Sequence, residues 1–173
     1  MKRTLIFALL TATTLTMFSC GKKSKDGLDM VKIPGKNFEM LRTEVTQELY
    51  ESVMGENPSY HQLGNEELDK EEKEALQKIC GDDTSKLPVD QVSWYDAIYF
   101  CNKLSEMKGY KPVYSVDGET DTSKWDYRPH SQDSIAYCDE IAQDERANGF
   151  RLPTYDEWVY AACGGQNYKY AGS

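Results

Sequence analysis

Apolar residues recur at helical spacing in three stretches of this chain, and each stretch starts at a residue able to cap a helix. The longest follows Ser93, where one helical face would carry Trp94, Ala97, Ile98, Cys101 and Leu104. Ser93 and Asp96 have the spacing of a capping box, and Gly109 closes the stretch. We predict an amphipathic core helix here.

Two shorter helices are predicted in the same way. Thr154 and Glu157 form a second capping box, and the apolar face that follows is Tyr155, Trp158, Val159 and Ala162, ending at Gly164-Gly165. This helix is expected to pack on the core. Thr46 is the expected cap of a third helix, which turns Leu49, Tyr50 and Val53 inward and ends at Gly55.

The remaining segments complete an α+β pattern. Residues 30–33 and 37–41 read as a hairpin, and 111–116 as a strand. Residues 119–148 read as irregular, and Tyr168-Lys169-Tyr170 as the start of another strand. An exposed helix is predicted over 66–80 because three acidic residues precede a Lys by four positions: Glu66–Lys70, Asp69–Lys73 and Glu74–Lys78. A solvated face is favoured there over an acidic docking surface.

The segment GFRLPTYDEWVYAACGG, residues 149–165, resembles the signature of the formylglycine-generating enzyme family, the sulfatase-modifying factors. Three further segments resemble the same family in the same order: 30–40, 44–50 and 87–105. The resemblance implies an irregular, loop-rich α+β fold related to C-type lectin domains. Residues 30–173 would form the N-terminal portion of that domain, so the expected fold is C-terminally truncated.

The resemblance also limits what can be assigned. The family's redox-active cysteine pair, its active-site copper and most of its structural calcium ligands belong to the half of the domain that would follow Ser173. No catalytic residue and no metal ligand is therefore assigned in this chain. One departure lies in the matched part, where Met40 lacks the glycine that usually follows it.

The N-terminus reads as an export signal. Residues 1–19 have a charged start at Lys2 and Arg3 and an apolar or Thr-rich stretch, the pattern of a signal peptide. Ser19 and Cys20 resemble the end of a bacterial lipobox, so Cys20 is the predicted lipidation site and 20–29 a tether. In the alternative, the signal is an ordinary secretory one and Cys20 is incidental.

Charge narrows the choice of partners. The chain has 20 basic and 29 acidic residues, and loss of Lys2 and Arg3 with the leader would leave a net charge of −11. Such a chain is not expected to bind nucleic acid. Membrane attachment would be through the lipid anchor only, at the cell envelope or surface.

Four cysteines remain besides Cys20: Cys80, Cys101, Cys138 and Cys163. An even number in an exported protein suggests disulfides, with three possible connectivities. Buried reduced cysteines are the alternative for Cys101 and Cys163, which lie on apolar helical faces. By resemblance, these two match positions that in some family members pair with cysteines of the later half.

Two functions are compatible with these observations. The chain is expected to be a non-catalytic scaffold that binds a protein or glycan ligand. The alternative is part of a copper-dependent oxidase that converts a sulfatase cysteine to formylglycine.

Overall fold

The computed structural model describes residues 2–4, 28–130, 140–166 and 168. The strands are β1 (Lys2–Thr4), β2 (Met30–Lys32), β3 (Phe38–Leu41), β4 (Tyr114–Val116), β5 (Ile141–Gln143) and β6 (Phe150–Arg151). The helices are α1 (Gln47–Met54), α2 (Lys70–Cys80), α3 (Trp94–Met107) and α4 (Tyr155–Ala162), with a 3-10 turn, η1, at Thr122–Lys124. The predicted strand at 168–170 lies almost wholly outside the described residues.

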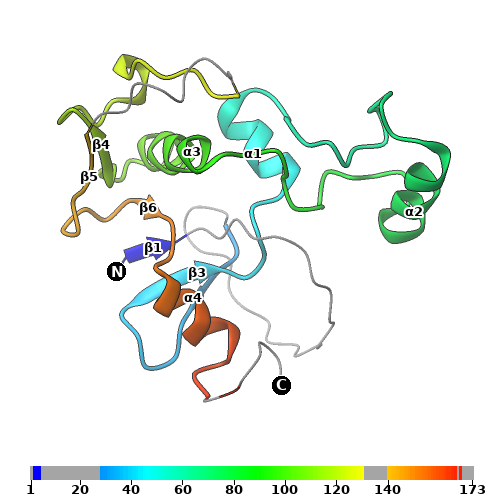
Figure 1. Ribbon diagram of the computed structural model, residues 1–173. Coiled ribbons are helices and arrows are strands. Elements are labelled where there is room, and N and C mark those ends of the chain that lie inside the picture. The colour runs from blue at the N-terminus through cyan, green and yellow to red at the C-terminus, as the bar shows by residue number, and fades with distance from the viewer. Residues whose placement is uncertain (1, 5–27, 131–139, 167, 169–173) are drawn as a thin grey trace.

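Two small sheets accompany these helices, which confirms the α+β class (Figure 1). One has the order β2-β3-β1-β6, with β2 antiparallel to β3 and β1 parallel to both of its neighbours. The other pairs β4 with β5 antiparallel. The prediction that 119–148 is irregular was wrong for β5, because its three residues lack strong alternation and only the pairing with β4 makes them a strand.

The predicted helix starts are largely confirmed. Thr46, Ser93 and Thr154 each accept the expected backbone N–H, and the last two form complete capping boxes. Helix α2 is shorter than predicted. Asp69 caps it by a box with Glu72, so residues 66–69 lie outside the helix and the observed ion pair is Lys70–Glu74.

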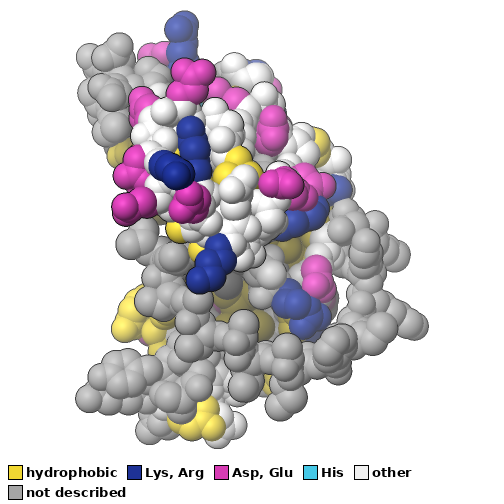
Figure 2. Space-filling model, turned by 90° about the vertical axis from the view of Figure 1, so that its right-hand side faces the viewer, with side chains coloured by type: hydrophobic (Ala, Val, Ile, Leu, Met, Phe, Trp, Pro, Cys, Tyr) yellow, Lys and Arg dark blue, Asp and Glu magenta, His cyan; other side chains and the backbone are white. Residues whose placement is uncertain are grey.

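Figure 2 looks onto the molecule from the side of α2 and shows acidic and basic side chains interspersed on this face. This mixture supports the expectation of a solvated helix face over a purely acidic docking surface.

Helix α3 is the centre of the core. Ile98, Cys101 and Leu104 are at most 1% exposed, and Phe100 stacks on Tyr50 of α1 with ring centroids 5.1 Å apart. Figure 1 shows α3 running between α1 and the β4–β5 sheet. Tyr50 is fully buried in this contact, so α3 covers the apolar side of α1.

Polar side chains on α3 complete the packing. Asn102 donates to the carbonyl oxygens of Tyr114 and Thr120 and accepts the Tyr114 N–H at 3.0 Å. Ser105 accepts the N–H of Phe150 at 2.8 Å through its hydroxyl. These buried side chains take the place of ladder partners that the short strands do not provide.

Gly149 is required by a close approach. A Cβ at this position would lie 2.4 Å from the carbonyl oxygen of Lys111 and 2.6 Å from the Ser105 hydroxyl. Any side chain would push β6 away from α3.

Helix α4 is poorly covered, which corrects the expectation that its apolar face packs on the core. None of its residues is buried, and Tyr155 and Trp158 are 80% and 38% exposed. Two polar contacts attach it to the rest of the chain. Tyr160 donates to the Pro34 carbonyl oxygen at 3.0 Å, and Glu157 pairs with Arg151.

Leu28 is buried in the core and Asp29 pairs with Arg42, so the end of the predicted tether contacts the domain. Within the described residues, every helix is too short or too polar to cross a membrane.

Because α4 is partly exposed, substitutions in it should lower the free energy of unfolding less than a substitution in the core. Phe150→Ala, at a fully buried ring, should lower the free energy of unfolding by about 3–5 kcal/mol. Thr154→Ala removes a cap acceptor and should cost about 1 kcal/mol. Trp158→Ala should cost about 1–2 kcal/mol because its ring is already partly in water. Denaturant unfolding of the three variants measures this order, and a Trp158→Ala loss equal to that of Phe150→Ala would contradict it.

Candidate functional site

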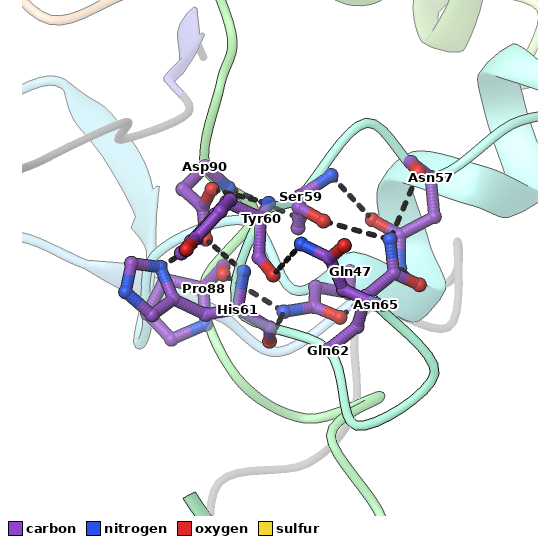
Figure 3. A network of polar contacts seen from close by, with 9 residues as sticks. All are labelled: Gln47, Asn57, Ser59, Tyr60, His61, Gln62, Asn65, Pro88 and Asp90. Carbon is purple, nitrogen blue, oxygen red and sulfur yellow. Dashed lines mark hydrogen bonds and ion pairs between the residues drawn. The ribbon is translucent and has the colours of Figure 1, made fainter. Parts of the chain in front are cut away.

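A loop between α1 and α2, residues 57–67, is held in place by amide side chains (Figure 3). Gln47 of α1, only 1% exposed, donates to the His61 carbonyl oxygen at 3.0 Å and accepts from the Asn57 amide at 3.0 Å. Gln62 and Asn65 donate to backbone carbonyls inside the loop at 2.7 and 2.9 Å. These hydrogen bonds pair backbone carbonyl groups of the loop, which belongs to no strand or helix.

Asp90 fixes the same loop from the other side. Its carboxylate accepts the N–H groups of Tyr60 at 2.7 Å and His61 at 3.3 Å, and contacts the His61 ring nitrogen Nδ1 at 2.9 Å. The Asp90 N–H in turn donates to the Ser59 hydroxyl at 3.1 Å. Side-chain hydrogen bonds therefore hold the loop from two sides, at Gln47 and at Asp90.

The loop borders a hollow of about 580 Å³. Its lining is mostly polar and consists of Pro58, Ser59, Tyr60, Gln62, Gly64, Asn65, Glu67 and Gln91. An aromatic ring among amide and carboxylate groups suits a ligand with its own donors and acceptors, such as a peptide backbone.

A second hollow, the aromatic groove, lies between the N-terminal ends of α3 and α4. It has a volume of about 480 Å³ and is lined by Val92, Ser93, Trp94, Ala97, Leu152, Pro153, Thr154, Tyr155 and Trp158. Trp94 is 50% exposed, so large apolar rings from both helices face solvent here. An apolar groove of this kind is typical of a contact surface for another polypeptide segment.

Asp96 of α3 lies at the centre of a buried polar cluster. Its carboxylate accepts the Tyr127 hydroxyl at 2.7 Å, the His130 N–H at 3.0 Å and the Ser93 hydroxyl at 2.7 Å. Burial raises the pKa of Asp96, but these donors outweigh it and hold the pKa below its usual value. Nε2 of His130 lies 3.0 Å from the Tyr50 hydroxyl, so the cluster joins α1, α3 and the 127–130 segment.

Three of the five cysteines lie in the part of the chain that the structure describes. Cys80, Cys101 and Cys163 are free thiols, and Cys20 and Cys138 lie outside the described residues. Burial raises the pKa of the Cys101 thiol, which makes it a poor nucleophile. A disulfide involving Cys138 stays a prediction, as does lipid on Cys20.

Across the described ranges, no three His, Cys, Asp or Glu side chains come together as a metal site. The copper and calcium that the resemblance implies stay predictions.

The sequence analysis assigned Trp94, Tyr155 and Trp158 of the groove to apolar core faces, whereas all three are exposed. It missed the hollow beside the 57–67 loop. The available signal was the density of amide side chains around Pro58, since Asn57, Gln62 and Asn65 fall within nine positions. Their partners Gln47 and Asp90 are distant in sequence, so only the structure shows the cluster.

Comparison with known proteins agrees with this fold. The sulfatase-modifying factor enzyme 1-like domain matches residues 14–173. The chaperone protein LppX of Paenibacillus barcinonensis is 35% identical over 155 residues, which cover 88% of this chain and 46% of LppX.

Two solved structures are similar. Treponema denticola variable protein 1 has a TM-score of 0.54 and 38% identity, covering 75% of this chain and 43% of its own. CarF has a TM-score of 0.51 and 28% identity, covering 78% and 50%. This chain thus spans about half the length of the relatives it matches. By this match over most of its length, the chain belongs to the family of sulfatase-modifying factor enzyme 1-like domains.

Proposed function

We propose that this chain is the binding part of an exported lipoprotein, a non-catalytic scaffold that holds a protein ligand at the hollow beside residues 57–67. The observation that carries the proposal is the prearranged loop around Gln47 and Asp90, which keeps a polar, aromatic-walled hollow open to solvent. A surface that is ordered before binding loses less conformational entropy when the ligand binds.

A protein ligand is favoured over a glycan because a relative 35% identical to this chain is named a chaperone. The lining also offers what a polypeptide backbone requires, amide donors and carboxylate acceptors beside the Tyr60 ring. Lipid on Cys20 would place this hollow at the cell envelope, and residues 20–27 would link it to the membrane.

The name of the family keeps a second function open, the oxidation of a sulfatase cysteine to formylglycine. Its chemistry needs a reactive thiolate beside copper, and the buried Cys101 does not provide one. We expect no such activity from this chain.

The ligand site is tested with a fluorescently labelled, chemically unfolded polypeptide. Tyr60→Ala removes the aromatic wall but keeps the backbone bond to Asp90, and should weaken binding about tenfold or more. Tyr168→Ala is the matched control, because it removes an exposed Tyr that lines neither hollow and should leave the affinity unchanged. Equal affinities for all three proteins would contradict the site. Binding to a glycan array instead, lost in Tyr60→Ala, would assign the hollow to glycans.

Lipidation is tested by metabolic labelling with a fatty-acid probe. The wild type and a Cys80→Ala control should be labelled, and Cys20→Ala should not, because only Cys20 follows the apolar stretch and a small residue. Labelling that persists in Cys20→Ala, or is absent from the wild type, would remove the lipid anchor from the proposal.

The second function is tested by incubating the purified chain with copper, a reductant and a peptide carrying the acceptor sequence Cys-x-Pro-x-Arg. We expect the peptide mass to stay that of the free cysteine. An aldehyde product detected by mass spectrometry would show that the chain is an oxidase and not a scaffold.

A further inference from the structure

The polar groups around the hollow beside residues 57–67 divide into those that brace the loop and those that do not. Gln62 and Asn65 line the hollow, but their amides donate inside the loop, as Figure 3 shows. Their amide oxygens are engaged as well, since Gln62 accepts from Asn57 at 3.4 Å and Asn65 accepts the Glu67 N–H at 3.0 Å. A ligand would have to displace these hydrogen bonds to reach either amide.

Glu67 and Gln91 are the lining residues left for a ligand. Within the described part of the chain, the side chains of both are exposed and make no hydrogen bond or ion pair. Glu67 offers a carboxylate, which only accepts hydrogen bonds, and Gln91 offers an amide that both donates and accepts. Among the described residues, those that line the hollow include no Lys or Arg, so its wall holds no countercharge for Glu67.

The backbone of Gln91 is held in a conformation that non-glycine residues rarely adopt. Its φ is 58°, in the left-handed region. The residue before it is Asp90, whose carboxylate accepts the N–H groups of Tyr60 and His61. The bracing of the loop and the placement of Gln91 at the hollow are therefore linked, and strained residues of this kind cluster at ligand sites.

Tyr60, which also lines the hollow, lies in a negative electrostatic environment. Desolvation raises the pKa of its phenol, and the Glu72 and Glu67 carboxylates raise it further because they disfavour a second negative charge nearby. The same carboxylates favour a cation beside the ring. A cation within about 6 Å of the centre of a Tyr ring is also attracted by the ring itself.

We propose that the hollow binds a basic side chain of the polypeptide ligand. This inference rests on the proposed function and names the residue type that the site recognises. The Glu67 carboxylate would pair with the charged group, and the Tyr60 ring would cover its apolar stem. The Gln91 amide would bond to the ligand backbone next to that side chain.

The test uses a fluorescently labelled, unfolded synthetic polypeptide that contains lysine and lacks arginine. One sample has its lysines acetylated, which removes their charge, and another has them guanidinated to homoarginine, which keeps it. Because both treatments change every lysine, the charge separates their effects. In fluorescence anisotropy with the purified full chain, the unmodified and guanidinated forms should bind about threefold or more tightly than the acetylated form.

Substitutions assign the charge preference to the hollow. Glu67→Gln should abolish it, because the amide keeps the size of the side chain without its charge. Glu66→Gln is the matched control, since it removes the same charge from the neighbouring exposed residue, which does not line the hollow, and it should keep the preference.

Gln91→Gly tests the backbone contact separately. Glycine accepts a φ of 58° without strain, so this variant removes only the side chain. It should weaken the binding of all forms of the polypeptide by about threefold and leave the charge preference intact.

The outcomes separate this inference from the proposed function. Binding that Tyr60→Ala weakens, but that is equal for the acetylated and guanidinated forms, would overturn the basic side chain and leave the polypeptide site standing. A preference that Glu66→Gln reduces as much as Glu67→Gln does would show long-range attraction by an acidic chain, and would overturn Glu67 as the partner of the charge. Failure of every form to bind the wild-type chain would overturn the proposed function itself.

Discussion

The short strands and loops around helix α3 depend on three polar side chains on the buried side of that helix. Asp96, Asn102 and Ser105 are each at most 2% exposed, and each bonds to the backbone of a different segment. The strands are only two to four residues long, so ladder pairing alone leaves many backbone groups without partners. Asp96, Asn102 and Ser105 supply hydrogen-bond partners for such groups. The loops can therefore pack against the core.

The chain therefore has a well-packed core around α3 and a poorly covered side at α4. Around α3, rings such as Tyr50 and Phe150 are fully buried. Toward α4 the packing thins, and two tryptophans and Tyr155 face solvent. Exposed apolar surface of this kind promotes association, which agrees with a domain face that another polypeptide segment covers.

The two hollows differ in the side chains that line them. The hollow beside residues 57–67 has polar walls, and its loop is braced by Gln47 and Asp90 from both sides. The groove has aromatic walls, and α4 contributes a helix held mainly by Tyr160 and the Arg151–Glu157 pair. Arg151 also holds the pKa of Glu157 below its usual range, so this pair persists at neutral pH. A prearranged polar surface suits reversible binding of a ligand, whereas an apolar groove suits a permanent partner.

Much of the local structure follows from the sequence alone. The capping boxes at Ser93 and Thr154, the left-handed end at Gly55 and the β2–β3 hairpin depend on residues close in the chain, and all were predictable. The family was also readable from residues 149–165, because the motif is long. Burial was not. Helical spacing marks an apolar face but does not say what covers it, and so Trp158 was assigned to a core that does not reach it. Three features join residues that are far apart in the sequence: strand β5, the position of β1 and the cluster around Gln47. Only tertiary packing decided them, because it brings their hydrogen-bonding groups together.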